Sequence, residues 1–339
     1  MSYNRVYKTH RRKVTNMTTE LNASIIAKQY SDESEAYKFL ESIRWKHGAI
    51  CPHCGNIGAE LIEHKNGGRK TRTGKITNRR TWRCHGCKEQ FSVLVGTIFE
   101  GSHIPLSKWL LAIHELNADK NGISSCELAR KLGITQKSAW FMAQRIRFAM
   151  AHTSLEDKLT GTVEVDETYI GGLEKNKHAN KKTEGTQGRS VKTKTPVLSA
   201  VERGGSVYSK SLTTVSSGNI RKVLLDRVDK GATLNTDIFP VYNQVGQEFQ
   251  AHKTVDHGTG EFVRGNAYTN TAEGYFPQLK RSLSGTFHHV SEKHLDRYLA
   301  EFDYRYNTRR VKDGERTKET IRRVTGKRLT YKAIKGDGQ

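Results

Sequence analysis

Two pairs of cysteines place the strictest limit on how the first hundred residues of this chain can fold. Cys51 and Cys54 form one Cys-x-x-Cys pair, and Cys84 and Cys87 form a second pair after an interval of 29 residues. Each pair can present two thiolates from a tight turn, and two such turns complete a tetrahedral zinc site. The spacing therefore predicts a zinc ribbon with a structural zinc ion, because four thiolates leave no coordination position open for chemistry. Two unrelated redox or structural pairs are the alternative.

The segment from residue 122 to 147 has the pattern of a helix-turn-helix. Ser124 or Ser125 can cap a short first helix, Gly133 supplies the turn, and Thr135 can cap a second helix. The outward positions of the second helix would then be free to contact a DNA major groove. These positions are Gln136, Lys137, Ser138 and Arg145. A helical hairpin that serves only as scaffolding is the alternative.

Three acidic residues lie in separate predicted elements of the second half of the chain. Asp166 lies in an alternating strand at residues 162–170, Asp237 ends a strand-like run at 232–237, and Glu273 opens a helix expected from about 271 to 281. A lone acid on a strand is usually a solvated surface residue. Three carboxylates from separate elements of a strongly basic chain instead suggest a site for divalent metal ions that acts on a polyanion.

The charge of the chain indicates which polyanion to expect. Lys and Arg number 57 against 35 Asp and Glu, which gives a net charge of +22 and a pI near 9.8. An excess of this size attracts nucleic acid. A membrane surface is the competing anion, but no apolar run approaches the roughly 18 residues of a spanning helix. The first residues also lack the apolar core of a signal peptide. We therefore expect a soluble, cytoplasmic protein without a membrane partner.

The order of predicted elements indicates a multidomain α+β chain. Three strands in a meander, a helix, and then a strand that ends in an acid match the layout of an α/β ribonuclease H-like domain. The expected organisation is a basic arm at 1–30, an N-terminal helix and zinc ribbon at 31–100, a helix-turn-helix DNA-binding region at 101–152, a ribonuclease H-like catalytic domain at 160–310, and a basic tail at 311–339.

Several motifs resemble those of bacterial insertion-sequence transposases that carry a zinc ribbon before a DDE-type catalytic domain. The resemblance extends in order over roughly residues 33–310. The motifs that carry it are Cys51-Pro-His-Cys54 with Cys84-His-Gly-Cys87, Val165-Asp-Glu-Thr-Tyr-Ile-Gly-Gly172, Asn270-Thr-Ala-Glu-Gly274 with Leu279-Lys-Arg281, and Val290-Ser-Glu-Lys-His-Leu-Asp-Arg-Tyr-Leu-Ala-Glu-Phe302. The chain departs from the family pattern at Tyr268, where a histidine is expected.

The resemblance implies a catalytic triad of Asp166, Asp237 and Glu273, with Lys280 as a DNA-contacting lysine. Asn270 stays open as an alternative third residue of the triad. The resemblance also implies that the triad holds two Mg²⁺ or Mn²⁺ ions and that the reaction is DNA cleavage followed by attack of a 3′-hydroxyl on target DNA. The implied partners are double-stranded DNA, as terminal repeats of the element and as target, and further copies of the chain in a homo-oligomer on DNA. The implied location is the nucleoid in the cytoplasm.

Two other functions remain open at this point. One is a DNA-binding regulator in which the zinc ribbon and the helix-turn-helix do all the work and the C-terminal domain is inactive. The other is a nuclease or junction resolvase of the same fold, which would cut DNA without joining it. A cleavage and joining assay with and without Mg²⁺ separates the three possibilities.

Overall fold

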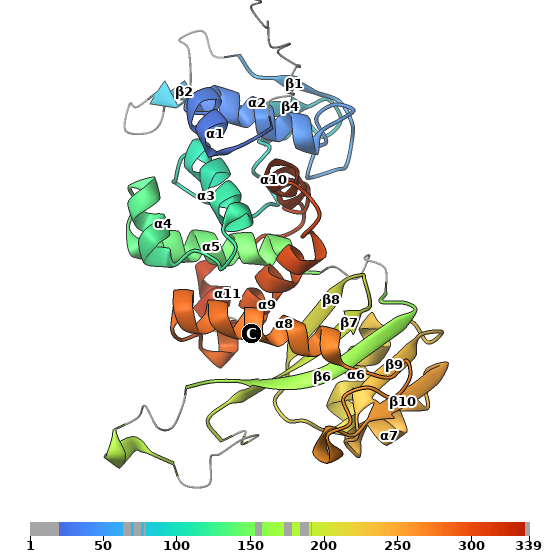
Figure 1. The fold of residues 1–339 in the computed structure, drawn as a ribbon. Helices are drawn as coiled ribbons and strands as arrows, with labels where there is room; N and C mark the ends of the chain where they lie inside the picture. Colours follow the sequence, from blue (N-terminus) through green and yellow to red (C-terminus); the bar gives the residue numbers. More distant parts are fainter. Residues whose placement is uncertain are drawn as a thin grey trace, which may run out of the picture.

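The computed structural model describes residues 20–63, 69–70, 76–77, 79–152, 158–172, 178–183, 190 and 192–335. These residues form a helical lobe with a small zinc-ribbon sheet at its outer end, and a sheet lobe built on five strands (Figure 1). Helices α8 (Asn270–Ser282) and α9 (Glu292–Asn307) lie where the two lobes meet.

The described residues that precede the zinc ribbon are helical. Helix α1 (Ala23–Gln29) begins at Asn22, whose side-chain oxygen accepts a hydrogen bond from the Ile25 N–H at 3.0 Å. Ile26 is buried in the core of the helical lobe. The prediction of a loose basic arm over 1–30 is therefore wrong for residues 23–29, because an apolar side chain anchors them, and residues 1–19 lie outside the described part. Helix α2 (Glu33–Arg44) follows at once.

The zinc-ribbon sheet has three short antiparallel strands in the order β1-β4-β5. A separate antiparallel pair, β2 with β3, lies between β1 and β4 in the sequence. Trp45 contacts the rings of Trp82 and Phe91 edge-on, and these aromatic side chains join the ribbon to the end of α2. The strand bounds are β1 (Ala59–Leu61), β2 (Arg69–Lys70), β3 (Ile76–Thr77), β4 (Trp82–Cys84) and β5 (Gln90–Phe91).

The helical lobe is built around α3 (Leu106–Ala118), α4 (Ser125–Leu132) and α5 (Gln136–Met150). The turn between α4 and α5 matches the prediction: Gly133 has φ +60°, a conformation that glycine adopts without steric cost, and Ser124 and Thr135 cap the two helices with their hydroxyl oxygens.

The chain returns to the helical lobe after the sheet lobe. Helices α10 (Asp313–Arg322) and α11 (Tyr331–Lys335) pack on it, and Ile321 and Val324 are fully buried among its core residues. The prediction of a basic tail over 311–339 is therefore wrong for the described residues up to 335, because apolar side chains spaced along the basic segment bind it to the first half of the chain. Residues 336–339 lie outside the described part.

The sheet lobe has the ribonuclease H-like layout that the sequence predicts. Its strand order is β10-β9-β6-β7-β8; β6, β7 and β8 are antiparallel neighbours, whereas β9 runs parallel to both β6 and β10. Helices α6 and α7 cover one face of the sheet, and α8 and α9 cover the other. The bounds are β6 (Thr162–Ile170), β7 (Thr195–Glu202), β8 (Val207–Ser211), α6 (Ser217–Arg227), β9 (Thr233–Asp237), α7 (Val241–Gly246) and β10 (Ala251–Val255).

Helix α9 covers the edge strand β8. The backbone N–H groups of Val207, Ser209 and Ser211 point out of the sheet, and each donates a hydrogen bond to a side chain of α9. The acceptors are Asn307 at 2.7 Å, Asp303 at 2.6 Å and Asp296 at 2.9 Å. These side chains satisfy donors that a further strand would otherwise bind.

The two lobes are joined by a buried ionic cluster between α5 and α9. Glu301, with no exposed surface, accepts hydrogen bonds from Arg147 at 2.5 Å and from Arg305 at 2.5 Å. Arg305 also donates to the carbonyl of Leu116 at 2.6 Å, and the Arg147 guanidinium lies 4.0 Å from the centre of the Tyr298 ring.

None of the helices in the described residues combines the length and the apolar character needed to cross a bilayer.

Candidate active site and zinc site

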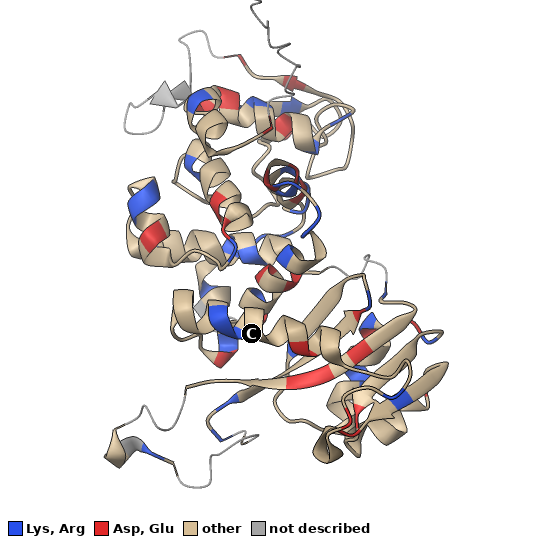
Figure 2. Ribbon diagram, viewed as in Figure 1, with Lys and Arg blue, Asp and Glu red and all other residues tan. Residues whose placement is uncertain are grey.

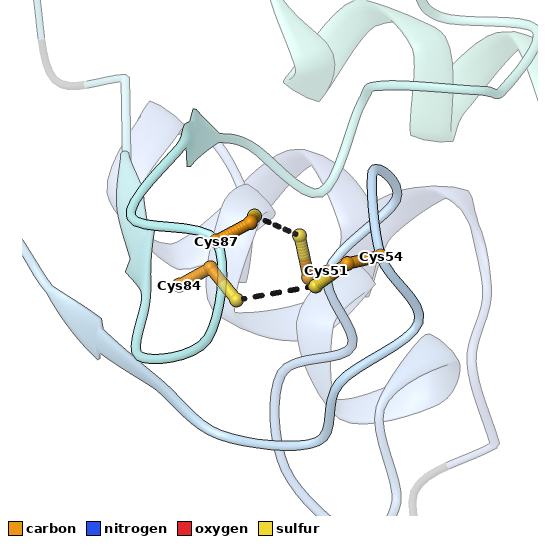
Figure 3. Close-up of side chains that lie close together, drawn as sticks. All are labelled: Cys51, Cys54, Cys84 and Cys87. Atoms are coloured by element: carbon orange, nitrogen blue, oxygen red, sulfur yellow. Dashed lines mark hydrogen bonds between the residues drawn. The ribbon is translucent and has the colours of Figure 1, made fainter.

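The four cysteines of the zinc ribbon lie together, as their spacing predicts. All four sulfur atoms are within 4.8 Å of one another. Cys51 Sγ lies 3.6 Å from Cys87 Sγ, and Cys54 Sγ lies 3.6 Å from Cys84 Sγ (Figure 3). One pair comes from the turn after residue 50 and the other from the end of β4 and its turn.

The turns that hold the cysteines also favour thiolates. The N–H of His53 donates to Cys51 Sγ at 3.4 Å, and the N–H of Gly86 donates to Cys84 Sγ at 3.3 Å. A hydrogen bond from the Cys87 backbone N–H contributes most to lowering the pKa of Cys84, which falls to about 6. Four convergent sulfur ligands, of which Cys84 has a lowered pKa, fit a tetrahedral zinc ion.

Replacing Cys54 with serine is expected to reduce bound zinc from one ion per chain to well below half, because a hydroxyl is a poor zinc ligand at neutral pH. Metal content of the purified protein measures this directly. The matched control is Cys126→Ser, since Cys126 is exposed on α4 and stands outside the four-sulfur cluster. Equal zinc content in the Cys54 variant and the wild type would exclude the cluster as a zinc site.

Strand register brings Asp166 and Asp237 to the same place. Along β6, Val163 and Val165 enter the core under α6 and α7, so Glu164 and Asp166 point to the opposite face, toward α8. In the parallel pairing of β6 with β9, Glu164 stands opposite Asn235. Two residues further along each strand are Asp166 and Asp237. Both carboxylates therefore lie on the α8 side of the sheet, at the end where the pairing of β6 with β9 stops.

The pKa of Asp166 reports the charges around it. This pKa is raised from 3.8 to about 6: burial is the largest cause, a hydrogen bond from the Glu167 N–H at 2.7 Å opposes the rise, and the negative charges of Asp237 and Glu273 contribute to it. The charge of His257 also opposes it. The three acids that the sequence predicts as a triad thus act on one another electrostatically. Figure 2 shows the acidic segments of β6 and of the neighbouring part of α8 side by side.

Glu273 is held by two neighbours, Thr269 at the N-terminus of α8 and His257 from the segment after β10. Its Oε1 lies 3.2 Å from His257 Nδ1 and 3.4 Å from the hydroxyl of Thr269. His257 begins the 3₁₀ turn η3 (His257–Thr259) directly after β10, and its Nε2 lies 3.5 Å from the same hydroxyl. Among the described residues, the four cysteines are the only group of three or more potential metal ligands whose ligand atoms all lie within 4.8 Å of one another. The three carboxylates are therefore more widely spaced than the sulfur atoms.

Glu164 fixes α8 against β6, and the sequence analysis missed it. Its carboxylate accepts hydrogen bonds from the N–H groups of Thr271 at 2.7 Å and Ala272 at 3.1 Å, so it caps the N-terminus of α8 from the neighbouring strand. Arg203 donates to the same carboxylate at 2.6 Å. The available signal was the position of Glu164 two residues before Asp166, which places both side chains on one face of the strand.

Arg203 also explains the departure from the family pattern at Tyr268. Its guanidinium lies 3.4 Å from the centre of the Tyr268 ring, and it donates to the carbonyls of Asn266 and Tyr268 at 2.9 Å each. The aromatic ring at position 268 thus packs on the arginine that holds Glu164, directly before the helix that carries Glu273.

Changing Glu164 to glutamine is expected to lower the free energy of unfolding by about 2–3 kcal/mol, because the amide nitrogen that replaces Oε1 cannot accept the hydrogen bonds from Arg203 and the Thr271 hydroxyl, and both Arg203 and the N-terminus of α8 lose the negative charge that they face. Chemical denaturation measures this loss. The control is Glu248→Gln, which breaks the solvent-exposed pair with Arg221 and should cost less than about 1 kcal/mol. Equal losses in the two variants would contradict the capping role.

The four residues predicted to contact DNA divide into two groups. Gln136 and Lys137 are exposed at the start of α5, and Ser138 is partly buried beside them. Arg145 is buried, and its guanidinium donates to the carbonyls of Ile98 at 2.7 Å and Leu329 at 2.9 Å. The prediction that Arg145 addresses a groove is therefore wrong, because the returning C-terminal segment covers that face of α5. Lys280 and Asn270 are both exposed on α8.

Two family models match the chain, and they match the parts that the structure separates. A transposase zinc-ribbon domain matches residues 31–90, and an ISXO2-like transposase domain matches residues 158–307. A protein of the transposable element ISH50 of Halobacterium salinarum, described as uncharacterized, is 29% identical over 302 residues, which cover 87% of this chain and 97% of the relative.

Two solved structures of Mos1 transposase show weak similarity. A pre-cleavage Mos1 transpososome is 12% identical, with 62% of this chain and 76% of that chain covered and a TM-score of 0.22. A Mos1 paired-end complex with the left transposon end is also 12% identical, with 61% and 79% covered and a TM-score of 0.20. Scores this low support no comparison of detail.

The domain matches and the ISH50 relative agree with the order of elements in the structure. The zinc-ribbon match contains the four clustered cysteines, and the transposase match contains all five strands of the large sheet together with Asp166 and the two acids whose charges act on it. The chain belongs to the insertion-sequence transposases that carry a zinc ribbon ahead of an ISXO2-like transposase domain.

Proposed function

We propose that this chain cuts DNA at the ends of its insertion sequence and joins the freed 3′ ends to target DNA, using Asp166, Asp237 and Glu273. The observation that carries the proposal is the electrostatic environment of Asp166, whose pKa burial raises to about 6 and whose neighbours are the other two acids. Three carboxylates in one neighbourhood repel one another, and divalent cations relieve that repulsion.

The donor set suits Mg²⁺ or Mn²⁺. Carboxylate oxygens are the ligands that these ions prefer, in contrast to the sulfur ligands of the zinc ribbon. When bound, two such ions lower the pKa of the attacking water or 3′-hydroxyl and stabilise the leaving oxygen of an in-line displacement. The protein's part is to place Asp166 and Asp237 on adjacent strands, just past the point where the pairing of β6 with β9 stops, and to bring Glu273 to them on a helix that Glu164 caps.

Glu273 fits the third position of the triad better than Asn270 does. The charge of Glu273 raises the pKa of Asp166, and His257 and Thr269 hold its carboxylate. Asn270 is exposed at the first residue of α8. Asn270 and Glu273 are three residues apart, which is nearly one turn of the helix. Of the two side chains, only that of Glu273 brings an anionic oxygen to the site.

The proposed DNA contacts come from both lobes. Lys280 follows Glu273 by seven residues, or two turns of α8, so an ammonium group lies on the same side of the helix as the acid and can bind a phosphate next to the cleaved bond. Gln136, Lys137 and Ser138 at the start of α5 are proposed to contact the terminal repeat. Two element ends must be held together for joining, so we propose that the active species is a homo-oligomer on DNA.

The test is a cleavage and joining assay with a labelled end of the element and a target plasmid, run with Mg²⁺ and with a chelator. Mg²⁺-dependent cutting at the end, followed by covalent joining to the plasmid, supports the proposal. Binding without cutting would identify a regulator, and cutting without joining would identify a nuclease or resolvase. Either of these results overturns the proposed function.

A further inference from the structure

Exposed apolar side chains follow the ends of the two strands next to the three acids. Among the described residues, six large apolar side chains are exposed, and three of them lie in the segments that leave the ends of the neighbouring parallel strands β9 and β10, namely Ile238, Phe262 and Val263. Their exposed fractions are 52%, 58% and 53%. Ile238 directly follows Asp237, and its N–H donates to the carbonyl of Val255 at 3.0 Å, which ties it to the end of β10. Phe262 belongs to the loop that leaves β10 at this point.

The ring of Phe262 is linked to the proposed catalytic site through one side chain. It packs on the ring of His257 with centroids 5.5 Å apart and an angle of 35° between the planes. His257 in turn lies 3.2 Å from the carboxylate of Glu273. With 58% of Phe262 exposed, one side of the ring rests on His257 and much of the remainder faces solvent.

The loop that presents Phe262 has a defined backbone. Arg264 donates to Glu261 at 2.8 and 2.5 Å, and Arg264 and Ala267 exchange two backbone hydrogen bonds of 2.9 Å. The Glu261 N–H donates to the Asp256 carbonyl at 3.0 Å, which closes the turn. The exposed ring is therefore held in place by its loop before any ligand arrives.

The surroundings of the three exposed apolar side chains favour DNA as their ligand. Lys253 on β10 pairs with Asn235, which pairs with Glu164, so exposed Lys253 lies on the same face of the sheet as the acids. Lys280 is exposed on α8. Exposed apolar side chains close to exposed lysines and next to a proposed phosphate-cutting site match a nucleotide, which has an aromatic face and a negative phosphate.

We propose that Ile238, Phe262 and Val263 hold an unpaired base of the element end next to the cleaved phosphate, with Phe262 stacked on that base. This inference rests on the proposed function. A base that leaves the duplex stack next to the reacting phosphate would let the strand bend toward the carboxylates, and apolar side chains stabilise such unstacked, bent DNA. The aromatic ring accepts any base, because every base has a π face.

The test compares Phe262→Ala with wild-type protein on two versions of the element end, one fully paired and one with a mismatch at the cleavage site. Loss of the stacking contact should slow cleavage of the paired end about 10-fold or more. The mismatched end, which is already unpaired, should restore the rate to within about 3-fold of the wild type. Phe262→Trp should keep the wild-type rate on both ends. Val311→Ala is the matched control, because Val311 is an exposed apolar residue just before α10.

A second measurement separates this inference from the proposed function. Element ends carrying the fluorescent base 2-aminopurine at successive positions are mixed with protein in metal-free buffer, where no cutting is required. Wild-type protein should raise the fluorescence at one position next to the cleavage site, and Phe262→Ala should not. A wild type that brightens the base but never cuts DNA supports the base site and overturns only the catalytic proposal. Unchanged fluorescence with the wild type, or an altered oligomeric state in Phe262→Ala with normal cleavage, overturns the base site.

Discussion

Changing Asp166 to asparagine is expected to lower the rate of end cleavage at least about a thousandfold, equal to about 4 kcal/mol of transition-state stabilisation. The amide has the size of the carboxylate but lacks the negative charge that binds a divalent cation. Binding of the terminal repeat should stay within about threefold of the wild type, because the proposed repeat contacts lie on α5 in the other lobe.

The same substitution, Asp166→Asn, should raise the stability of the folded protein although it lowers the rate of cleavage. Burial raises the pKa of Asp166 from 3.8 to about 6, so the folded protein favours the neutral carboxyl group. Neutral Asp166 therefore contributes to the stability of the folded state at low pH, and this contribution is lost as the pH rises through about 6. At pH 7.5 and without metal, the charged carboxylate is therefore destabilising. The Asp166→Asn variant should melt at a higher temperature than the wild type at that pH and should lose this advantage below pH 4.

Two assays check these statements, namely cleavage of a labelled end and thermal unfolding in chelator. The control is Glu167→Gln, because Glu167 points to the opposite face of β6 and accepts a hydrogen bond from Tyr242 at 2.6 Å. Cleavage by this control should stay within about threefold of the wild type. If Asp166→Asn retains cleavage, the catalytic assignment fails.

Removing the carboxylate of Glu301 is expected to have the largest effect on stability. Glu301→Ala leaves the guanidinium groups of Arg147 and Arg305 buried, with exposed fractions of 2% and 7%, and without their shared counter-ion. The loss of one partner from a buried ionic cluster costs about 3–5 kcal/mol. For a protein of this size the melting temperature should fall by about 4–7 °C.

A compensated variant separates charge from packing. Arg147→Met, Glu301→Leu and Arg305→Met together replace the cluster with apolar side chains of similar volume, and the triple variant should recover most of the stability that Glu301→Ala loses. The surface control is Glu319→Ala, whose pairs with Arg322 and Arg323 are partly exposed. Thermal unfolding of all four proteins gives the comparison. A Glu301→Ala variant that melts within 2 °C of the wild type, or a triple variant as unstable as Glu301→Ala, would refute this account.

The sequence predicts those parts of the fold that depend on short-range patterns. The cysteine spacing predicts the four-sulfur cluster, and the alternation of Val163 and Val165 predicts β6 at residues 162–170. The caps at Ser124 and Thr135 follow from residues within three positions of each other. Pro277 lies within the helix expected from about 271 to 281, and α8 continues through it to Ser282. Apolar residues on both sides of Pro277 pack on the sheet and outweigh the one missing backbone donor.

The predictions from the sequence that fail concern residues whose contacts are far away in the sequence. Arg145 looks solvent-exposed because its partners, Ile98 and Leu329, are 47 and 184 residues away. Glu164 looks like an ordinary polar residue of an alternating strand because the helix that it caps begins 106 residues later. Arg305, in the C-terminal half, is buried and binds the carbonyl of Leu116 and the carboxylate of Glu301, so a basic composition in that half does not mean exposure to water.

The packing of α10 against the first half of the chain determines when that half can be completed during synthesis. The nascent chain releases α3, Trp109 and Leu116 from the ribosome some two hundred residues before Ile321 and Val324 emerge to cover them. The sheet, by contrast, has all five strands available as soon as residue 255 is made. A chain that ends between residue 255 and residue 321 would contain all five strands of the sheet but would leave the core of the helical lobe uncovered. Premature termination should therefore yield aggregation-prone fragments rather than separate working domains.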